Sequence, residues 1–369
     1  MIKFYNNFIK KQIITLWKIL QHFFVLINFS KIIKSKKIKI FYAGAISGNY
    51  GGSFVKIKRI KEFYPKSYLS FNLVYILSNA IFVIPQSISY LKKNKIPIIL
   101  NQNGVFYSGW YNGNWKKKNF EMSNIYHQAD FVFWQSKFCK KCADKFLGKR
   151  KGPGEVLYNS VDTDIFIPKN KKLTRNQNTF NFLITGKIPY ALEYRVISAI
   201  RGLDLAIKKG LDANLIVAGE LDKKVLVNCK QLINQLNIRN RFLYLGRYSQ
   251  ANAPIIYQKG DAYIMLKYKD PCPNTVIEAM SCGLPVLYSN SGGLPEIVSQ
   301  DCGIGLRVRD SWEKGDIIPK YSDIADGMLK IYDNHKKFSQ NARNLAVRKF
   351  DLKFWIERHK LIFKKYKST

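Results

Sequence analysis

The chain has 369 residues, 47% of them hydrophobic, so it can bury two cores of ~100 to 200 residues each and is not a disordered protein. Its formal net charge of +36 would suit anionic lipid, nucleic acid or phosphorylated substrates, but the basic residues are spread along the whole chain. No helix-turn-helix, zinc or RNA-binding signature is present, so we expect no nucleic-acid partner.

The N-terminal extension, residues 1–35, predicts an amphipathic helix followed by a basic run. Between residues 13 and 29 the polar side chains of IITLWKILQHFFVLINF fall mostly on one helical face. The segment is too short and too interrupted to span a bilayer, which takes ~20 mostly apolar residues, and no small-residue cleavage site precedes the lysines. We favour a helix lying on the anionic inner face of the cytoplasmic membrane. A helix packed on the protein itself, or against the C-terminal segment, is the alternative.

Residues 36–167 alternate short apolar runs with longer amphipathic segments, which is the pattern of parallel strands joined by helices. The expected strands are 38–42, 72–77, 97–100, 131–134 and 155–158. The first strand leads into GAISGNYGGSF, where Gly51 and Gly52 allow close approach of the backbone to a phosphate and Ser53 can cap the next helix. An ordinary strand-to-helix turn is equally compatible with this loop.

A polar stretch at 168–178 interrupts the alternation and predicts a linker. The pattern resumes in residues 179–345, with expected strands at 180–185, 213–218, 242–245, 262–266 and 285–288. Two doubly wound α/β domains follow, with ligand in a cleft at the carboxyl ends of the strands. The last segment, 346–369, predicts a helix that packs back on the first domain.

The most informative stretch lies at 270–299 and reads DPCPNTVIEAMSCGLPVLYSNSGGLPEIVS. Pro271 and Pro273 exclude a helix before Asn274, which can cap one that continues to Gly283. An ordinary capped helix between two strands would share this pattern. The acidic residues on either side of the helix start point to a ligand site.

Two carboxylates flank that helix start. Free N–H groups at Asn274, Thr275 and Val276 would form a cationic pocket suited to a diphosphate. Glu278, one turn further on, can accept hydrogen bonds from both hydroxyls of a ribose. Asp270, placed before the turn, can reach a sugar on the other side of the phosphates.

This segment resembles the donor-site signature of glycosyltransferase family 4, the retaining transferases of GT-B fold. In that signature two acidic residues flank seven others and precede A-M-x-x-G-x-P-V and Gly-Gly-x-x-E. The matching residues are Glu278, Ala279, Met280, Gly283, Pro285, Val286, Gly292, Gly293 and Glu296. Asp270 stands where the family usually has Glu, and Cys272 and Pro273 replace its aromatic residue and glycine. Further similarity at 101–104, 129–138 and 157–168 extends the resemblance over nearly everything after residue 36.

The resemblance implies two Rossmann-like domains that face a central cleft, and transfer of a sugar with retention of anomeric configuration. Negative charge develops on the departing β-phosphate and, without a metal, must be met by basic side chains and helix amides. Lys187, after the strand FLITG, and Arg195, in the helix of ALEYRVISAI, match the family's basic residues. In the resemblance Asp270 positions the sugar and Glu278 binds the ribose.

The resemblance also implies roles for residues outside this signature. The glycine loop with Gly51 and Gly52 falls where the family meets the donor phosphates, and Arg247 and Tyr248 lie where relatives approach the nucleobase. Asn101, Asn103 and Gly104 lie on the acceptor side, where many relatives carry His.

No metal or other cofactor is expected. Asp162 and Asp164 spell D-x-D, but in a loop just before the linker and not at a strand end in the nucleotide domain. The histidines at 22, 127, 335 and 359 have no ligand spacing. The cysteines at 139, 142, 229, 272, 282 and 302 form no paired zinc spacing, so we interpret them as reduced thiols of a cytoplasmic protein.

The expected function is therefore transfer from a nucleotide sugar to a glycan or lipid-linked glycan, in assembly of bacterial surface polysaccharide. A sugar-nucleotide epimerase of the same GT-B architecture is one alternative. A basic protein that binds nucleic acid is another, and a non-catalytic carbohydrate-binding scaffold is a third.

Overall fold

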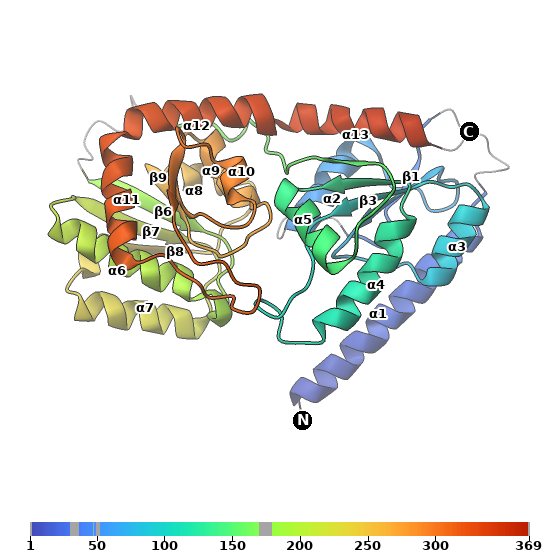
Figure 1. Ribbon diagram of the computed structural model, residues 1–369, viewed down its shortest axis with the longest axis horizontal. Helices are drawn as coiled ribbons and strands as arrows, with labels where there is room; N and C mark the ends of the chain where they lie inside the picture. The colour runs from blue at the N-terminus through green and yellow to red at the C-terminus, as the bar shows by residue number, and fades with distance from the viewer. Residues whose placement is uncertain (1, 30–36, 47, 49–51, 170–178, 368–369) are drawn as a thin grey trace. The chain divides into compact units, whose positions relative to one another are not determined.

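The computed structural model describes residues 2–29, 37–46, 48, 52–169 and 179–367 (Figure 1). The chain forms two compact units. The first comprises residues 1–107, 111–158 and 356–369, and the second comprises residues 108–110 and 159–355. Most of the expected linker at 168–178 lies outside the described residues.

Among its described residues, the first unit holds a sheet of five parallel strands. They are β1 (Ile40–Phe41), β2 (Leu73–Leu77), β3 (Ile98–Gln102), β4 (Phe131–Trp134) and β5 (Gly154–Val156), in that spatial order. The connecting helices are α2 (Gly52–Phe63), α3 (Pro85–Lys93), α4 (Trp115–Gln128) and α5 (Lys137–Phe146). Every strand expected here is confirmed. Because α2 begins at Gly52, Ser53 lies inside the first turn and the expected cap at Ser53 is wrong.

Strand β1 has a pairing partner on each of its two edges. Ile40 pairs with Leu73 of β2 on one edge and, through a single parallel bridge, with Lys66 on the other. Pro65 precedes the bridge and has no N–H, which limits growth of a full strand there. The chain therefore passes to one side of β1 at Lys66 and to the other side at β2, as in a doubly wound sheet. The outermost strand of that sheet is reduced to the single bridge at Lys66.

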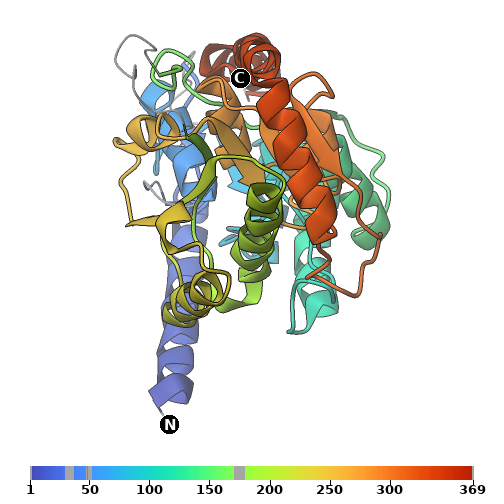
Figure 2. The same ribbon diagram turned by 90° about the vertical axis from the view of Figure 1, so that its left-hand side faces the viewer.

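One face of helix α1 (Ile2–Leu26) packs on the first unit. The indole N–H of Trp17 donates to the carbonyl of Gly44 at 3.1 Å, and His22 Nδ1 lies 2.8 Å from Ser87 Oγ. Figure 2 shows the N-terminal part of α1 extending beyond the rest of this unit. The face away from the unit carries exposed apolar side chains: Ile13, Leu16, Ile19, Phe23 and Leu26. No described helix is long and apolar enough to cross a membrane.

The expected C-terminal helix is divided. Helix α12 (His335–Phe350) ends before Asp351, whose backbone is extended, and α13 (Leu352–Tyr366) follows. From residue 356 onward α13 belongs to the first unit. There His359 Nε2 lies 3.0 Å from the hydroxyl of Tyr75, and both side chains are fully buried.

Within the described part of the second unit, six parallel strands form the sheet. They are β6 (Phe180–Thr185), β7 (Ala213–Ala218), β8 (Phe242–Gly246), β9 (Ala262–Met265), β10 (Val286–Ser289) and β11 (Gly303–Leu306). Their spatial order, β11-β10-β9-β6-β7-β8, reverses between β6 and β9. The covering helices are α6 (Tyr194–Lys208), α7 (Lys223–Gln235), α8 (Ala253–Tyr257), α9 (Asn274–Ser281), α10 (Leu294–Ile297) and α11 (Tyr321–Asp333). Five of the strands were expected, and β11 was missed.

The carboxyl ends of β6 and β7 approach each other through two glycines. The N–H of Gly186 donates to the carbonyl of Ala218 at 3.0 Å. Gly219 has a φ of +129°, and a Cβ added there would lie 2.1 Å from the carbonyl oxygen of Gly186. Only glycine therefore fits at 219 without displacing the end of β6.

We expect Gly219→Ala to destabilise the second unit by about 3 kcal/mol or more, since it adds a steric clash to backbone strain. Gly210→Ala is the matched control, because Gly210 has a φ of +94° but open space around its missing Cβ. That variant should cost about 1 to 2 kcal/mol. Urea unfolding followed by circular dichroism measures both. Equal losses for the two variants would show that the contact with Gly186 is unimportant.

Candidate functional site

The candidate site lies in the second unit, at the carboxyl ends of β6 and β9. The strand order reverses between these two strands, and ligands of doubly wound sheets bind at such a reversal. Most of the donor-side residues singled out from the sequence lie on the segments that follow these strands.

Helix α9 begins one residue earlier than expected. Pro273 is extended (φ −72°, ψ 119°) and occupies the capping position, so Asn274 is the first helical residue and the expected Asn274 cap is wrong. The N–H of Val276 donates to the carbonyl of Pro273 at 3.2 Å. The N–H groups of Asn274 and Thr275 have no acceptor within the helix. They are the amides at this helix start that remain for an anion.

Glu278 is held by a tyrosine that sequence reasoning did not identify. Its carboxylate is buried, and the hydroxyl of Tyr257 donates to Oε2 at 2.9 Å. The hydroxyl of Tyr257 also lies 3.2 Å from Thr185 Oγ1, at the end of β6. Burial and the neighbouring charge of Glu278 raise the pKa of both Tyr248 and Tyr257. Both hydroxyls therefore stay protonated at neutral pH and can donate.

Asp270 is fixed from two directions. Its Oδ1 accepts the N–H of Cys272 at 3.2 Å, and its Oδ2 accepts from Lys267 Nζ at 2.7 Å. The glycine pair of the signature packs behind it. Gly292 has a φ of +66°, and a Cβ added there would lie 2.5 Å from the carbonyl oxygen of Asp270. The same oxygen accepts the N–H of Gly293 at 2.9 Å. The carboxylate is thus already oriented by the protein.

Arg195 carries a buried guanidinium whose hydrogen-bonding capacity is only partly used. The residue lies in the first turn of α6 and is 5% exposed. Its Nη2 lies 3.5 Å from Met265 Sδ at the end of β9. Its Nε has no hydrogen-bond partner among the described residues. A buried cation is costly without a charged or polar partner, so this position favours an anionic ligand.

Lys187 and Arg247 converge on one carboxylate. Lys187 Nζ and Arg247 Nη2 lie 3.2 and 3.0 Å from Glu220 Oε1. Both basic side chains are exposed, and ion pairs of this kind contribute only about 0 to 1 kcal/mol. A phosphate can therefore compete with Glu220 for them. Glu220 follows β7 and was not predicted from the sequence.

The acceptor-side residues lie in the first unit around a buried lysine. Lys56 Nζ donates to Asn101 Oδ1 at 2.8 Å and to Asn103 Oδ1 at 3.0 Å. The carbonyl of Gly104 accepts from Gln102 Nε2 at 2.7 Å. An ammonium group thus lies at the end of β3, in the region where the resemblance suggested His. Sequence reasoning did not identify Lys56.

The glycine loop is only partly described. Gly51 lies outside the described residues, and Gly52 is the first residue of α2. Nothing in the described backbone tests the expected contact of these glycines with phosphate.

The D-x-D residues are engaged in local contacts. Asp162 Oδ1 accepts the N–H of Asp164 at 3.0 Å, and Asp164 pairs with Lys353 at 2.8 Å. Among the described residues, no group of three or more His, Cys, Asp or Glu side chains could hold a metal ion. The cysteines at 139, 142, 229, 272, 282 and 302 are all buried and free of disulfides.

Comparison with known proteins agrees with this architecture. Residues 169–345 match the family Glycosyl transferases group 1. The structure of Anabaena Alr3699/HepE in complex with UDP and glucose superposes with a TM-score of 0.67 at 15% identity, over 88% of this chain and 99% of that one. A glycosyltransferase from Rickettsia africae superposes with a TM-score of 0.61 at 18% identity, over 87% and 83% of the two chains.

Curated relatives match over shorter lengths. N-acetyl-alpha-D-glucosaminyl L-malate synthase of Bacillus anthracis is 23% identical over 57% of this chain and 53% of its own length. D-inositol 3-phosphate glycosyltransferase of Mycolicibacterium smegmatis is 24% identical over 47% and 40%. The chain spans about half the length of the first of these relatives.

The fold is that of the GT-B glycosyltransferases. The segment that matches the Glycosyl transferases group 1 family, residues 169–345, lies within the second unit and contains Arg195, Asp270 and Glu278.

Alkaline pH should destabilise the protein through groups around Glu278. Burial, and then the charge of Glu278, raise the pKa of the Cys282 thiol to about 12. Above pH ~9 the unfolded chain releases this proton while the folded chain keeps it, so the unfolded state binds fewer protons and the free energy of unfolding falls as pH rises. The buried hydroxyls of Tyr248 and Tyr257 act in the same direction at higher pH.

We expect urea unfolding to show a loss of stability that grows between pH ~9 and ~12, with no such slope near neutrality. Cys282→Ser should have a shallower slope above pH ~9, because its hydroxyl does not titrate there. Identical slopes for the variant and the wild type would remove Cys282 as a cause.

Proposed function

We propose that this protein transfers a sugar from a nucleoside diphosphate sugar to a hydroxyl acceptor, with retention of anomeric configuration. The observation that carries the proposal is the buried carboxylate of Glu278 in helix α9, which accepts a hydrogen bond from Tyr257 of α8. The first amides of α9, at Asn274 and Thr275, remain for an anion. A ribose diphosphate presents two hydroxyls and an anionic group, which are the partners that this arrangement requires.

The diphosphate would be bound by the α9 amides and by Arg195, whose buried Nε has no partner among the described residues. Each charge-assisted contact would contribute ~1.5 to 3 kcal/mol. Lys187 would join them by leaving Glu220. Structures of similar fold hold UDP, so uridine is the base that we propose.

In the proposed reaction the bond between the anomeric carbon and the β-phosphate oxygen breaks, and the acceptor oxygen bonds to that carbon on the same face. The acceptor proton passes to the departing phosphate, so no separate general base is needed. Asp270, already oriented by Lys267 and Cys272, positions the sugar and stabilises the positive charge that develops on it.

Thermal shift with a panel of nucleotide sugars tests the donor, because a ligand that binds only the folded state raises the melting temperature. NMR of the product formed with a glycan acceptor then reports its anomeric configuration. Formation of an inverted product would refute retention. A sugar that is epimerised while still attached to UDP would instead identify an epimerase.

We expect Glu278→Gln to raise the donor KM by about 10- to 100-fold, because the amide replaces a charged acceptor of the ribose hydroxyls. Glu357→Gln is the control, since Glu357 is an exposed residue of α13 paired with Lys360. Steady-state release of UDP measures both variants. An unchanged KM for Glu278→Gln would refute the ribose assignment.

We further propose that the protein works on a glycan or lipid-linked acceptor at an anionic membrane surface, in assembly of bacterial surface polysaccharide. Helix α1 supports this, because it offers exposed apolar side chains while its other face is held by Gly44 and Ser87. A formal net charge of +36 adds attraction to anionic lipid.

Replacing Ile13, Leu16 and Ile19 by Ser should abolish co-sedimentation with vesicles that contain phosphatidylglycerol, because those side chains supply the apolar contact. The variant should still bind UDP as the wild type does. The control replaces Phe120 and Leu361, which are exposed elsewhere on the first unit. Undiminished sedimentation of the α1 variant would exclude this helix as the membrane contact.

A further inference from the structure

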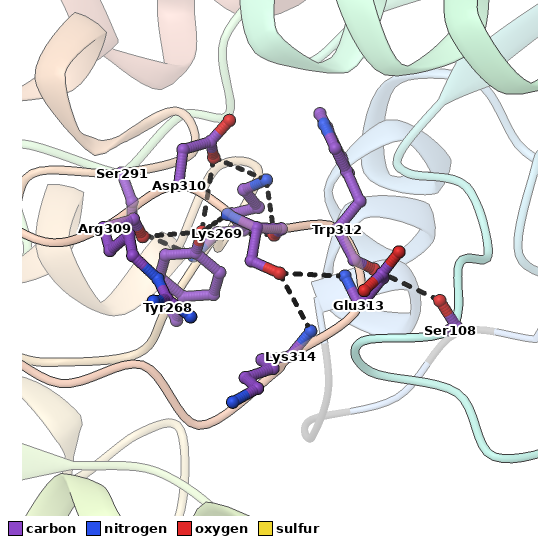
Figure 3. Close-up of polar contacts among 10 residues, drawn as sticks. Ser108, Tyr268, Lys269, Ser291, Arg309, Asp310, Trp312, Glu313 and Lys314 are labelled. Carbon is purple, nitrogen blue, oxygen red and sulfur yellow. Dashed lines mark hydrogen bonds and ion pairs between the residues drawn. The ribbon is translucent and has the colours of Figure 1, made fainter.

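The residue before Asp270 is a buried lysine that holds a neighbouring segment of chain (Figure 3). The side chain of Lys269 is only 2% exposed. Its ammonium group lies 2.7 Å from Asp310 Oδ1, donates to the carbonyl of Ser311 at 2.7 Å and lies 3.4 Å from the centre of the Trp312 ring. A carboxylate, a carbonyl and an aromatic face together replace the water that a lysine loses on burial.

Tyr268 holds the same segment. Its hydroxyl accepts the N–H of Ser311 at 2.6 Å and lies 3.0 Å from the carbonyl of Arg309. Burial raises the pKa of Tyr268 to about 12, so this hydroxyl is also a donor at neutral pH. Two consecutive side chains, at 268 and 269, therefore fix residues 309–312, which we call the strap.

The backbone of Lys269 sets the direction of the next residue. Its φ is +50°, in the left-handed region that a side chain disfavours by about 1 kcal/mol or more. Its N–H donates to Ser291 Oγ at 3.0 Å. The missing side chain of Gly292 leaves room for the backbone of Lys269 and Asp270. The carboxylate of Asp270 thus projects from a strained turn that the surroundings must hold.

The strap is also fixed on its other side. The carbonyl of Trp312 accepts the N–H of Gly109 at 2.9 Å and lies 3.3 Å from Ser108 Oγ. A Cβ on Gly109 would lie 2.8 Å from that carbonyl oxygen. Residues 108–110 belong to the same compact unit as the strap. The strap that Lys269 contacts is therefore fixed in place, so its contacts can stabilise the left-handed turn at Lys269.

We propose that Lys269 is a positioning residue for the sugar side of the donor site. Its contacts with Asp310, Ser311 and Trp312 hold the left-handed turn, and the turn aims the carboxylate of Asp270. Glu278 and the α9 amides are held separately, by Tyr257 and by the helix itself. Loss of Lys269 should therefore weaken recognition of the sugar and leave that of the nucleoside diphosphate intact. The inference rests on the proposed function.

The test compares Lys269→Met with Lys209→Met, whose lysine forms an exposed ion pair with Asp326. Calorimetry gives the Kd for UDP, and release of UDP gives hydrolysis rates of UDP-glucose and UDP-N-acetylglucosamine. We expect Lys269→Met to keep the wild-type Kd for UDP within about twofold and to lose about tenfold or more in kcat for donor hydrolysis. Lys209→Met should match the wild type, and Lys269→Arg should recover part of the rate.

Trp312→Leu is the second variant, because it removes the aromatic face without touching Lys269. It should give the same selective loss, and the double variant should be no worse than either single one, as expected for residues that act together. A merely structural role would instead lower the melting temperature and the UDP-binding fraction in proportion to the rate, and that result would overturn the proposal. Wild-type kcat in Lys269→Met would overturn it too. Failure of the wild-type protein to bind UDP would refute the proposed function itself.

Discussion

The start of helix α9 is the constraint on which the candidate site depends. Pro271 and Pro273 keep the chain out of a helix until Asn274, so Asp270 remains on a loop while Glu278 lies in the helix. Two carboxylates of like charge are thereby held on either side of two free amides. Each is satisfied locally, Asp270 by Lys267 and Glu278 by Tyr257, so both are oriented before any ligand arrives.

Most strands of the two sheets were predictable because they are buried on both faces. Runs such as FNFLIT at β6 and LVYIL at β2 are wholly buried, and a continuous apolar run signals a strand of this kind. Strand β11, GIGL, lacked the signal. It pairs closely with β10 because Gly303 has no Cβ, which would otherwise lie 2.1 Å from the carbonyl oxygen of Val286. Pairing, and not apolar content, makes that segment a strand.

Site residues were predictable where they lie in a segment with a recognisable pattern. Asp270 and Glu278 share one segment, and its proline-flanked helix start and resemblance to a family signature single them out. Other residues contact their partners from separate elements, so no spacing in the sequence predicts them: Lys56, Glu220 and Tyr257. Lysine is so common in this sequence that a single lysine does not by itself indicate a functional residue. Burial distinguishes Lys56 and Lys269 from exposed lysines such as Lys187.

The proposed donor site divides main-chain and side-chain recognition between its two ends. Amides at the start of α9 depend on the helix and change little with side-chain substitution, so they suit the diphosphate that all nucleotide sugars share. In this proposal the sugar end depends on Asp270, which follows a turn at Lys269 held by residues 309–312. Substitutions in that strap can therefore alter which sugar is accepted while the nucleotide contacts persist. If Asp270 contacts the sugar as proposed, specificity for the sugar is set some forty residues further along the chain, in the segment that holds Lys269 in place.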